Sequence, residues 1–199
     1  MKKNIILIIL VVLMLFVGFI VFKSYSSKEK VINQILIKDY KNATYTIEGR
    51  HITLINGLSE IEITPGSATK IITRYFGNEV KHDFNNDGRE DVAFILTQET
   101  GGSGTFFYFV AALNTPTGYV GSQAVFLGDR IAPQTTGMDE GKTSKGTDRQ
   151  NVIVVNYAVR LPNEPLATKP SMGKSLWLKL DPVTMQFGEV VQNFEGESR

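Results

Sequence analysis

The run from Phe106 to Ala112 most constrains what this chain can fold into, because seven consecutive residues are apolar. A Gly-rich stretch, residues 100–104, precedes the run, and the turn-forming residues 114–118 follow it. Successive side chains of a β-strand point to opposite faces of a sheet, so a strand that is apolar at every position buries both faces. The run therefore predicts a central strand with other parts of the chain packed on each side.

Short segments rich in β-branched and aromatic residues, separated by turn residues, continue this pattern over residues 43–194. Asn56-Gly57 is a strong hairpin signal and predicts that residues 51–55 pair with residues 58–63. The polar, Gly- and Thr-rich stretch 128–150 predicts an exposed excursion. We therefore expect a mainly β fold with a single antiparallel β domain, either a sandwich or a curled sheet. Further strands are expected at residues 68–76, 92–98, 123–127, 151–159 and 175–180, with a final one over 185–191.

An apolar segment at residues 5–22 contains no charged or strongly polar side chain; Lys2 and Lys3 precede it and Lys23 follows it. At about 1.5 Å of rise per residue, such a helix crosses most of the hydrocarbon core of a bilayer. The basic N-terminal tail favours a cytoplasmic N-terminus and a C-terminus on the other side. A cleavable signal peptide is the alternative, although residues 24–26 form a poor cleavage site.

The expected organisation is therefore that of a single-pass protein of the cell membrane, with the bulk of the chain outside the cytoplasm. Without any cysteine, disulfide bonds cannot stabilise the outer part, which depends on its hydrophobic core. The formal net charge of +1 gives no indication of a nucleic-acid partner. The expected parts are a cytoplasmic tail (residues 1–4), a transmembrane anchor (5–22), a stalk or linker (23–42), an extracytoplasmic β domain (43–194) and a flexible tail (195–199).

Residues 83–91 carry oxygen-bearing side chains at the spacing that a calcium loop requires. Positions one, three and five of the stretch turn inward, position six is a glycine, position seven supplies a carbonyl, and position nine adds a carboxylate. These groups nearly complete the about six to eight oxygens that Ca²⁺ collects, whereas Mg²⁺ keeps its waters and fits less well. The candidate ligands are Asp83, Asn85, Asp87, Arg89 through its backbone carbonyl, and Asp91, directly or through water.

This loop departs from an EF-hand, because Phe94 stands where the bidentate glutamate belongs and residues 92–97 predict a strand. It resembles the strand-flanked calcium loops of FG-GAP and integrin-type repeats, over about a dozen residues. A propeller would repeat the motif, and the sequence contains one copy. The alternative is an Asx-rich turn at residues 86–88 that simply joins two strands.

Three further stretches, residues 74–79, 101–106 and 126–134, look together with this loop like a domain of uncharacterised bacterial envelope proteins. Domains of that kind follow a signal anchor or a lipobox and sometimes adjoin a META-type domain. The resemblance implies location and architecture and carries no activity.

The sequence offers little for catalysis. Gly101-Gly102-Ser103-Gly104 is no nucleophile elbow, because Thr105 takes the last glycine position and a strand follows. We expect at least one of these glycines to adopt a positive φ. His51 and His82 are the only imidazoles, and they complete no set of nucleophile, base and orienting group, so no catalytic residue is assigned.

Two functions follow from these observations. The favoured one is a membrane-anchored, calcium-stabilised binding or structural module of the cell envelope, with an envelope protein or a glycan as its ligand. The alternative is an envelope hydrolase that uses Ser and Asp residues on its loops. For Gly128-Asp129-Arg130 we expect an internal ion pair that anchors a loop, with a ligand contact as the alternative.

Overall fold

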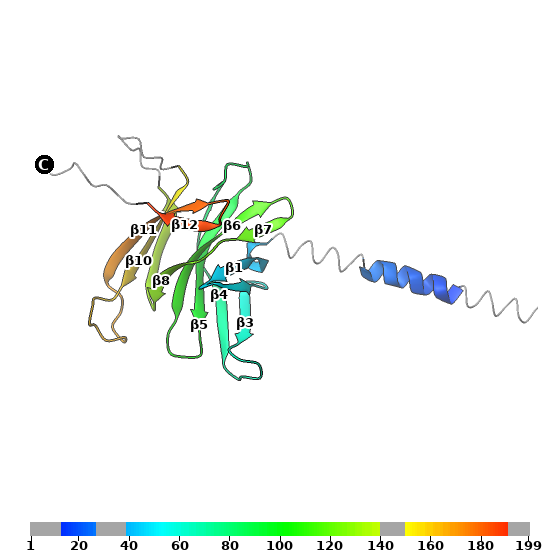
Figure 1. The fold of residues 1–199 in the computed structure, drawn as a ribbon, viewed down its shortest axis with the longest axis horizontal. Helices are drawn as coiled ribbons and strands as arrows, with labels where there is room; N and C mark the ends of the chain where they lie inside the picture. The colour runs from blue at the N-terminus through cyan, green and yellow to red at the C-terminus, as the bar shows by residue number, and fades with distance from the viewer. Residues whose placement is uncertain (1–12, 27–38, 140–149, 191–199) are drawn as a thin grey trace, which may run out of the picture.

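The computed structural model describes residues 13–26, 39–139 and 150–190 (Figure 1). Residues 13–26 form a helix, and no helix in these ranges combines the length and the apolar character needed to cross a membrane. The predicted anchor over residues 5–22 lies partly outside the described residues. Most of the expected stalk and the whole tail 195–199 also lie outside them. From residue 44 onward the regular elements of the described chain are antiparallel strands, which confirms the prediction of a mainly β fold.

The larger sheet contains six strands, and β6 lies near its centre. The hydrogen-bonded order is β3-β4-β5-β6-β7, and β8 pairs with the N-terminal half of β6 on the same side as β7. The strands are β3 (Leu58–Glu62), β4 (Lys70–His82), β5 (Asp91–Glu99), β6 (Phe106–Thr115), β7 (Gly118–Gly121) and β8 (Val125–Asp129).

A second sheet and a small hairpin complete the fold. The second sheet has the order β12-β11-β10-β9, and the hairpin β1-β2 follows a short 3-10 helix, η1. The two-residue turn Glu48-Gly49 joins the hairpin strands, and both residues have positive φ. The elements are η1 (Tyr40–Asn42), β1 (Thr44–Ile47), β2 (Arg50–Thr53), β9 (Ala132–Met138), β10 (Val152–Val159), β11 (Met172–Asp181) and β12 (Gln186–Glu189).

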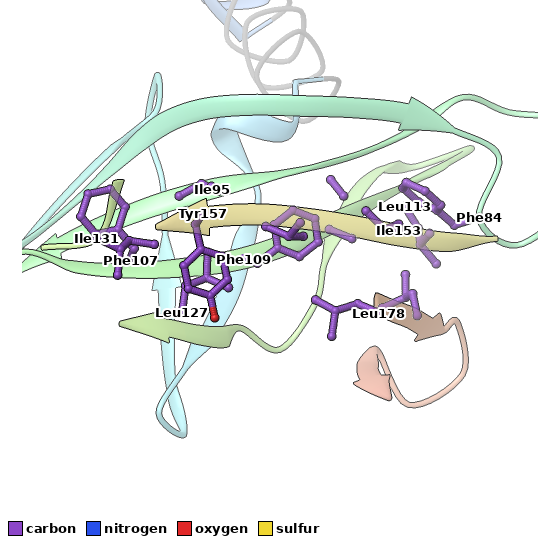
Figure 2. Packing of buried hydrophobic residues seen from close by; sticks show 14 residues of the cluster. Phe84, Ile95, Phe107, Phe109, Leu113, Leu127, Ile131, Ile153, Tyr157 and Leu178 are labelled. Carbon is purple, nitrogen blue, oxygen red and sulfur yellow. The ribbon is translucent and has the colours of Figure 1, made fainter. Parts of the chain in front are cut away.

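The larger sheet is buried on both faces at β5 and β6. Phe109 points toward the second sheet and packs in one core with Ile153 and Leu178, as Figure 2 shows. Tyr108, Val110 and Ala112, the alternate residues of β6, point the other way, into a core that contains Tyr45 of the hairpin. The run Phe106–Ala112 therefore forms the central, doubly covered strand that its sequence predicts.

The predicted hairpin at Asn56-Gly57 is wrong in its pairing. The two residues do form a turn with positive φ, 51° and 80°, but only one isolated bridge, Ile55 with Leu58, joins the flanking segments. The preceding strand β2 pairs with β1, and the following strand β3 pairs with β4. Burial of Ile52 and Leu54 in the hairpin-side core explains the difference, because it holds β2 against one face of the large sheet and away from β3.

The expected excursion at residues 128–150 is also wrong in its first half. Residues 132–138 form β9, which pairs with β10 at the edge of the second sheet. An edge strand is held mainly by backbone hydrogen bonds to one neighbour, so its side chains need no apolar alternation. Pro133 fits this position, because proline is tolerated on sheet edges.

Candidate metal centre

The loop that the sequence singles out connects β4 to β5 and is fixed at both ends by buried side chains. Phe84 inserts into the core between the two sheets (Figure 2), and Asp91 is buried at the start of β5. Asn86 and Gly88 have positive φ, 60° and 81°, which reverses the chain direction between them. The loop is therefore held in one place at the end of the sheet, and its tip, residues 86–88, is exposed.

Two predicted ligands converge on one backbone amide. The N–H of Asp87 donates to Asp83 Oδ1 at 3.0 Å and also to Asn85 Oδ1 at 3.1 Å. The other carboxylate oxygen of Asp83 accepts from the N–H of Gly88 at 2.7 Å. Carboxylate and amide oxygens each have two acceptor positions, so these bonds leave room for a further contact. The side-chain oxygens at positions one and three are thus brought together in this loop.

Asp87 is engaged with a cation of its own loop. Its carboxylate pairs with the guanidinium of Arg89 and accepts from Asn85 Nδ2 at 2.9 Å. Desolvation raises the pKa of the Asp87 carboxyl, but hydrogen bonds from Arg89 and Asn85, together with the Arg89 charge, hold that pKa below its ordinary value. Arg89 is also fixed through Nε, which donates to the carbonyl of Asn114 at 2.6 Å. This guanidinium is the present counter-ion of the loop.

Asp91 closes the base of the loop. Its two carboxylate oxygens accept from the N–H of Phe84 at 2.9 Å and from the N–H of Asn114, on β6, at 2.7 Å. Burial raises the pKa of the Asp91 carboxyl, the two backbone hydrogen bonds oppose the rise, and the charges of Asp87 and Asp83 add to it. The three carboxylates therefore repel one another across the loop.

The loop is also connected to the second sheet. Asn151, just before β10, donates from Nδ2 to the carbonyl of Phe84 at 3.1 Å. His82 Nε2 lies 3.0 Å from Asn151 Oδ1, so this imidazole helps to orient the asparagine. Sequence reasoning missed Asn114 and Asn151, which lie far from the loop along the chain and belong to no local motif.

The described residues of the loop meet part of what a calcium site requires. Their donors are the hard oxygen ligands that Ca²⁺ prefers. Asp83 and Asn85 come together, Asp87 is paired with Arg89, and Asp91 is turned toward the backbone. Within the described ranges, no group of three or more His, Cys, Asp or Glu side chains has an arrangement that could hold a metal ion.

The residues considered for catalysis lie apart. His51 Nδ1 is 3.1 Å from Thr46 Oγ1, and among the described residues neither His51 nor His82 bonds a serine hydroxyl or a carboxylate. Asp129 and Arg130 form the expected ion pair, and Asp129 Oδ1 also accepts from the N–H of Thr105 at 3.0 Å. This corner connects β8, β9 and the start of β6.

Comparisons of the chain with protein-family models, with curated proteins and with solved structures give no match. The resemblances to calcium loops of FG-GAP type and to a bacterial envelope domain therefore stay predictions.

Proposed function

We propose that this chain is a membrane-anchored, extracytoplasmic β module of the cell envelope, and that its 83–91 loop binds Ca²⁺. The observation that carries the calcium proposal is the convergence of Asp83 Oδ1 and Asn85 Oδ1 on the N–H of Asp87. Such a pair of oxygens supplies the first two ligands of an ion at little conformational cost, because the loop already holds them together.

Binding is expected to proceed by exchange of one cation for another. The Asp87 carboxylate leaves the Arg89 guanidinium for the ion, and the backbone carbonyl of Arg89 adds a further oxygen. Arg89 keeps its hydrogen bond to the carbonyl of Asn114, so its guanidinium remains fixed after the Asp87 carboxylate has left it. The ion's charge relieves the repulsion among Asp83, Asp87 and Asp91.

A loop of this kind without a bidentate carboxylate at position twelve belongs with the weak extracellular sites, for which Kd is about 10⁻⁴–10⁻³ M. At millimolar calcium such a site stabilises the folded state by on the order of 1 kcal/mol. The ion's role is then structural: it holds β4 and β5 in register and keeps the loop tied to β6 and to the second sheet.

Thermal unfolding of the full-length chain in millimolar calcium and in chelator tests the calcium proposal. A stabilisation of about 1 kcal/mol raises Tm by roughly 2–4 °C for a domain of this size. Asp83→Asn and Asp87→Asn are expected to abolish the rise. Glu90→Gln is the matched control, because it removes the same charge from an exposed position in the same loop and should leave the rise intact.

An identical Tm in calcium and in chelator for the unsubstituted chain would refute the calcium site. If Glu90→Gln also abolishes the calcium-dependent rise in Tm, the rise comes from general charge screening and not from a bound ion. Magnesium at the same concentration should give a smaller rise, because Mg²⁺ keeps its waters and demands a stricter geometry.

The membrane part of the proposal is supported by the apolar surface of residues 13–26. Met14 and Phe22 are among the large hydrophobic side chains that this helix exposes. We propose that residues 5–22 anchor the chain with its N-terminus in the cytoplasm, and that an envelope protein or a glycan is the partner outside. Cell fractionation with N-terminal sequencing tests this; a soluble mature chain that begins near Ser27 would contradict it.

A further inference from the structure

A groove of about 560 Å³ opens between the β1-β2 hairpin and the ends of β3, β4 and β5. It lies at the opposite end of β4 and β5 from the calcium loop, since its lining includes Ile71 and Gln98 while the loop follows His82. Its apolar lining consists of one residue type: Ile47, Ile52, Ile61, Ile63 and Ile71. We call this feature the isoleucine groove.

The groove exists because the hairpin covers only part of the sheet face. Tyr45 and Ile47 pack over the β5-β6 part of that face, where Phe94 and Tyr108 lie. Ile61 pairs with Ile71 across β3 and β4, beyond the cover, and Ile61 and Ile63 stay 40% and 47% exposed. Aliphatic surface that belongs to the sheet's core side is thus left open beside the hairpin.

The groove lining includes one basic side chain, Arg50, that has no partner in the part of the chain that the structure describes. Arg50, in β2, has no hydrogen bond or ion pair to another described residue. Glu48, which also lines the groove, accepts a hydrogen bond from the hydroxyl of Tyr108 at Oε1, at 2.7 Å. Deeper in, the Gln98 side chain donates from Nε2 to Thr73 Oγ1 at 3.1 Å. The groove therefore combines an aliphatic wall with a free guanidinium at its mouth.

This lining selects the chemistry of an occupant. Among the described lining residues His51 is the only aromatic side chain and five are isoleucines, so the lining favours an aliphatic occupant over a base or a sugar ring that needs a stacking surface. The volume lies within the range of about 300–1,000 Å³ that is typical of small-molecule sites. The guanidinium fork of Arg50 matches a carboxylate, with which it can form two parallel hydrogen bonds.

We propose that the isoleucine groove binds a fatty acid, with the acyl chain against the isoleucines and the carboxylate at Arg50. The inference goes beyond the proposed function and uses none of the calcium-loop residues, so either proposal can fail while the other stands.

Photo-crosslinking of the full-length chain in phosphatidylcholine nanodiscs tests this proposal. The probe is decanoic acid with a diazirine near the end of its chain, and peptide mapping should place the adduct on groove residues. Unlabelled octanoate, decanoate and dodecanoate should compete with potencies that rise roughly tenfold for every two methylene groups. Decanol that carries the same diazirine should label the groove roughly tenfold less, because it lacks the charge for Arg50.

Matched variants separate the groove from general apolar binding. Ile61→Gln and Ile63→Gln should each reduce labelling at least several-fold, whereas Ile55→Gln, at an isoleucine that is 65% exposed outside the groove, should not. Arg50→Gln should abolish the preference for the acid over the alcohol, and Arg74→Gln, an exposed control, should keep it. These positions are exposed, so a Tm close to that of the parent chain verifies the fold.

Adducts confined to residues 13–26, or labelling that the Ile61 and Ile63 substitutions leave unchanged, would overturn the proposal. Equal labelling by the acid and the alcohol would overturn the role of Arg50 and the assignment of a fatty acid. Competition by an aliphatic peptide but by none of the fatty acids would assign the groove to a protein partner instead.

Discussion

Single residues decide several turns of this fold, and asparagine and glycine account for most of them. Asn56, Asn86 and Asn151 all have positive φ, a conformation that asparagine tolerates better than most residues. Glu48 and Arg130 also have positive φ, 49° and 48°, and nothing in the local sequence predicts this. Their partners explain it, because Glu48 accepts from Tyr108 and the N–H of Arg130 donates to the carbonyl of Thr105 at 2.7 Å.

The Gly-rich loop after β5 shows the expected positive φ at one residue, Gly101, with a φ of 83°. A Cβ at Gly101 would lie 2.1 Å from Thr69 Cγ2, whereas a Cβ at Gly102 would meet nothing within 4 Å. Gly101→Val is therefore expected to lower the free energy of unfolding by about 1–3 kcal/mol. Gly102→Val is the control and should change it little. Urea denaturation measures both, and equal effects would show that the loop adapts to either side chain.

At the level of elements, the sequence predicts the buried strands best. β5, β6 and β10 are rich in apolar and β-branched residues, and their predicted positions agree with the structure within a few residues. β4 is longer than predicted and contains an irregularity at Gly77 and Asn78.

This irregularity brings Glu79 to two tyrosines, whose hydroxyls both donate to Glu79 Oε1. Burial and the Glu79 hydrogen bond raise the pKa of Tyr75 to about 12. The other tyrosine, Tyr40, belongs to η1, so the contact ties the start of the domain to β4. No local pattern predicts such a bulge, because its partner lies about forty positions away along the chain.

The corner between β8 and β9 gives an element-level prediction about acid stability. The side-chain hydrogen bond from Arg130 lowers the pKa of the Asp129 carboxyl below its ordinary value of 3.8, and the N–H of Thr105 adds to the effect. A carboxyl with a depressed pKa stabilises the folded state above the ordinary pKa, and this contribution disappears as the pH falls through the folded-state value.

Asp129→Asn should therefore lose less stability than the parent chain between about pH 5 and pH 3. Urea denaturation across that range, with the exposed carboxylate variant Glu99→Gln as control, measures the difference. If Asp129→Asn and the parent chain lose stability in parallel, the ion pair contributes nothing to the corner.

For the whole molecule, sequence patterns predict the composition of the layers but not their arrangement. The doubly apolar β6 requires cover on both faces, yet nothing in the sequence says that the β1-β2 hairpin covers one face and the second sheet the other. The same limit applies to the loop at residues 83–91. Its oxygens are evident from their spacing, whereas Asn114 and Asn151, which hold it in place, become neighbours only through the fold.

Alternate side chains of β5 and β6 belong to the two different cores, one on each face of the large sheet. We therefore expect the β layers to unfold as one unit. Phe94 is fully buried on the hairpin side, and Trp177, the sole tryptophan, lies in β11 on the opposite side. Phe94→Ala should cost about 3–5 kcal/mol and lower the urea midpoint equally by Trp177 fluorescence and by far-UV circular dichroism. Phe126→Ala, at an exposed residue of β8, is the control and should shift both midpoints little. An unchanged fluorescence midpoint beside a lowered dichroism midpoint would mean that the second sheet is stable without the hairpin-side core.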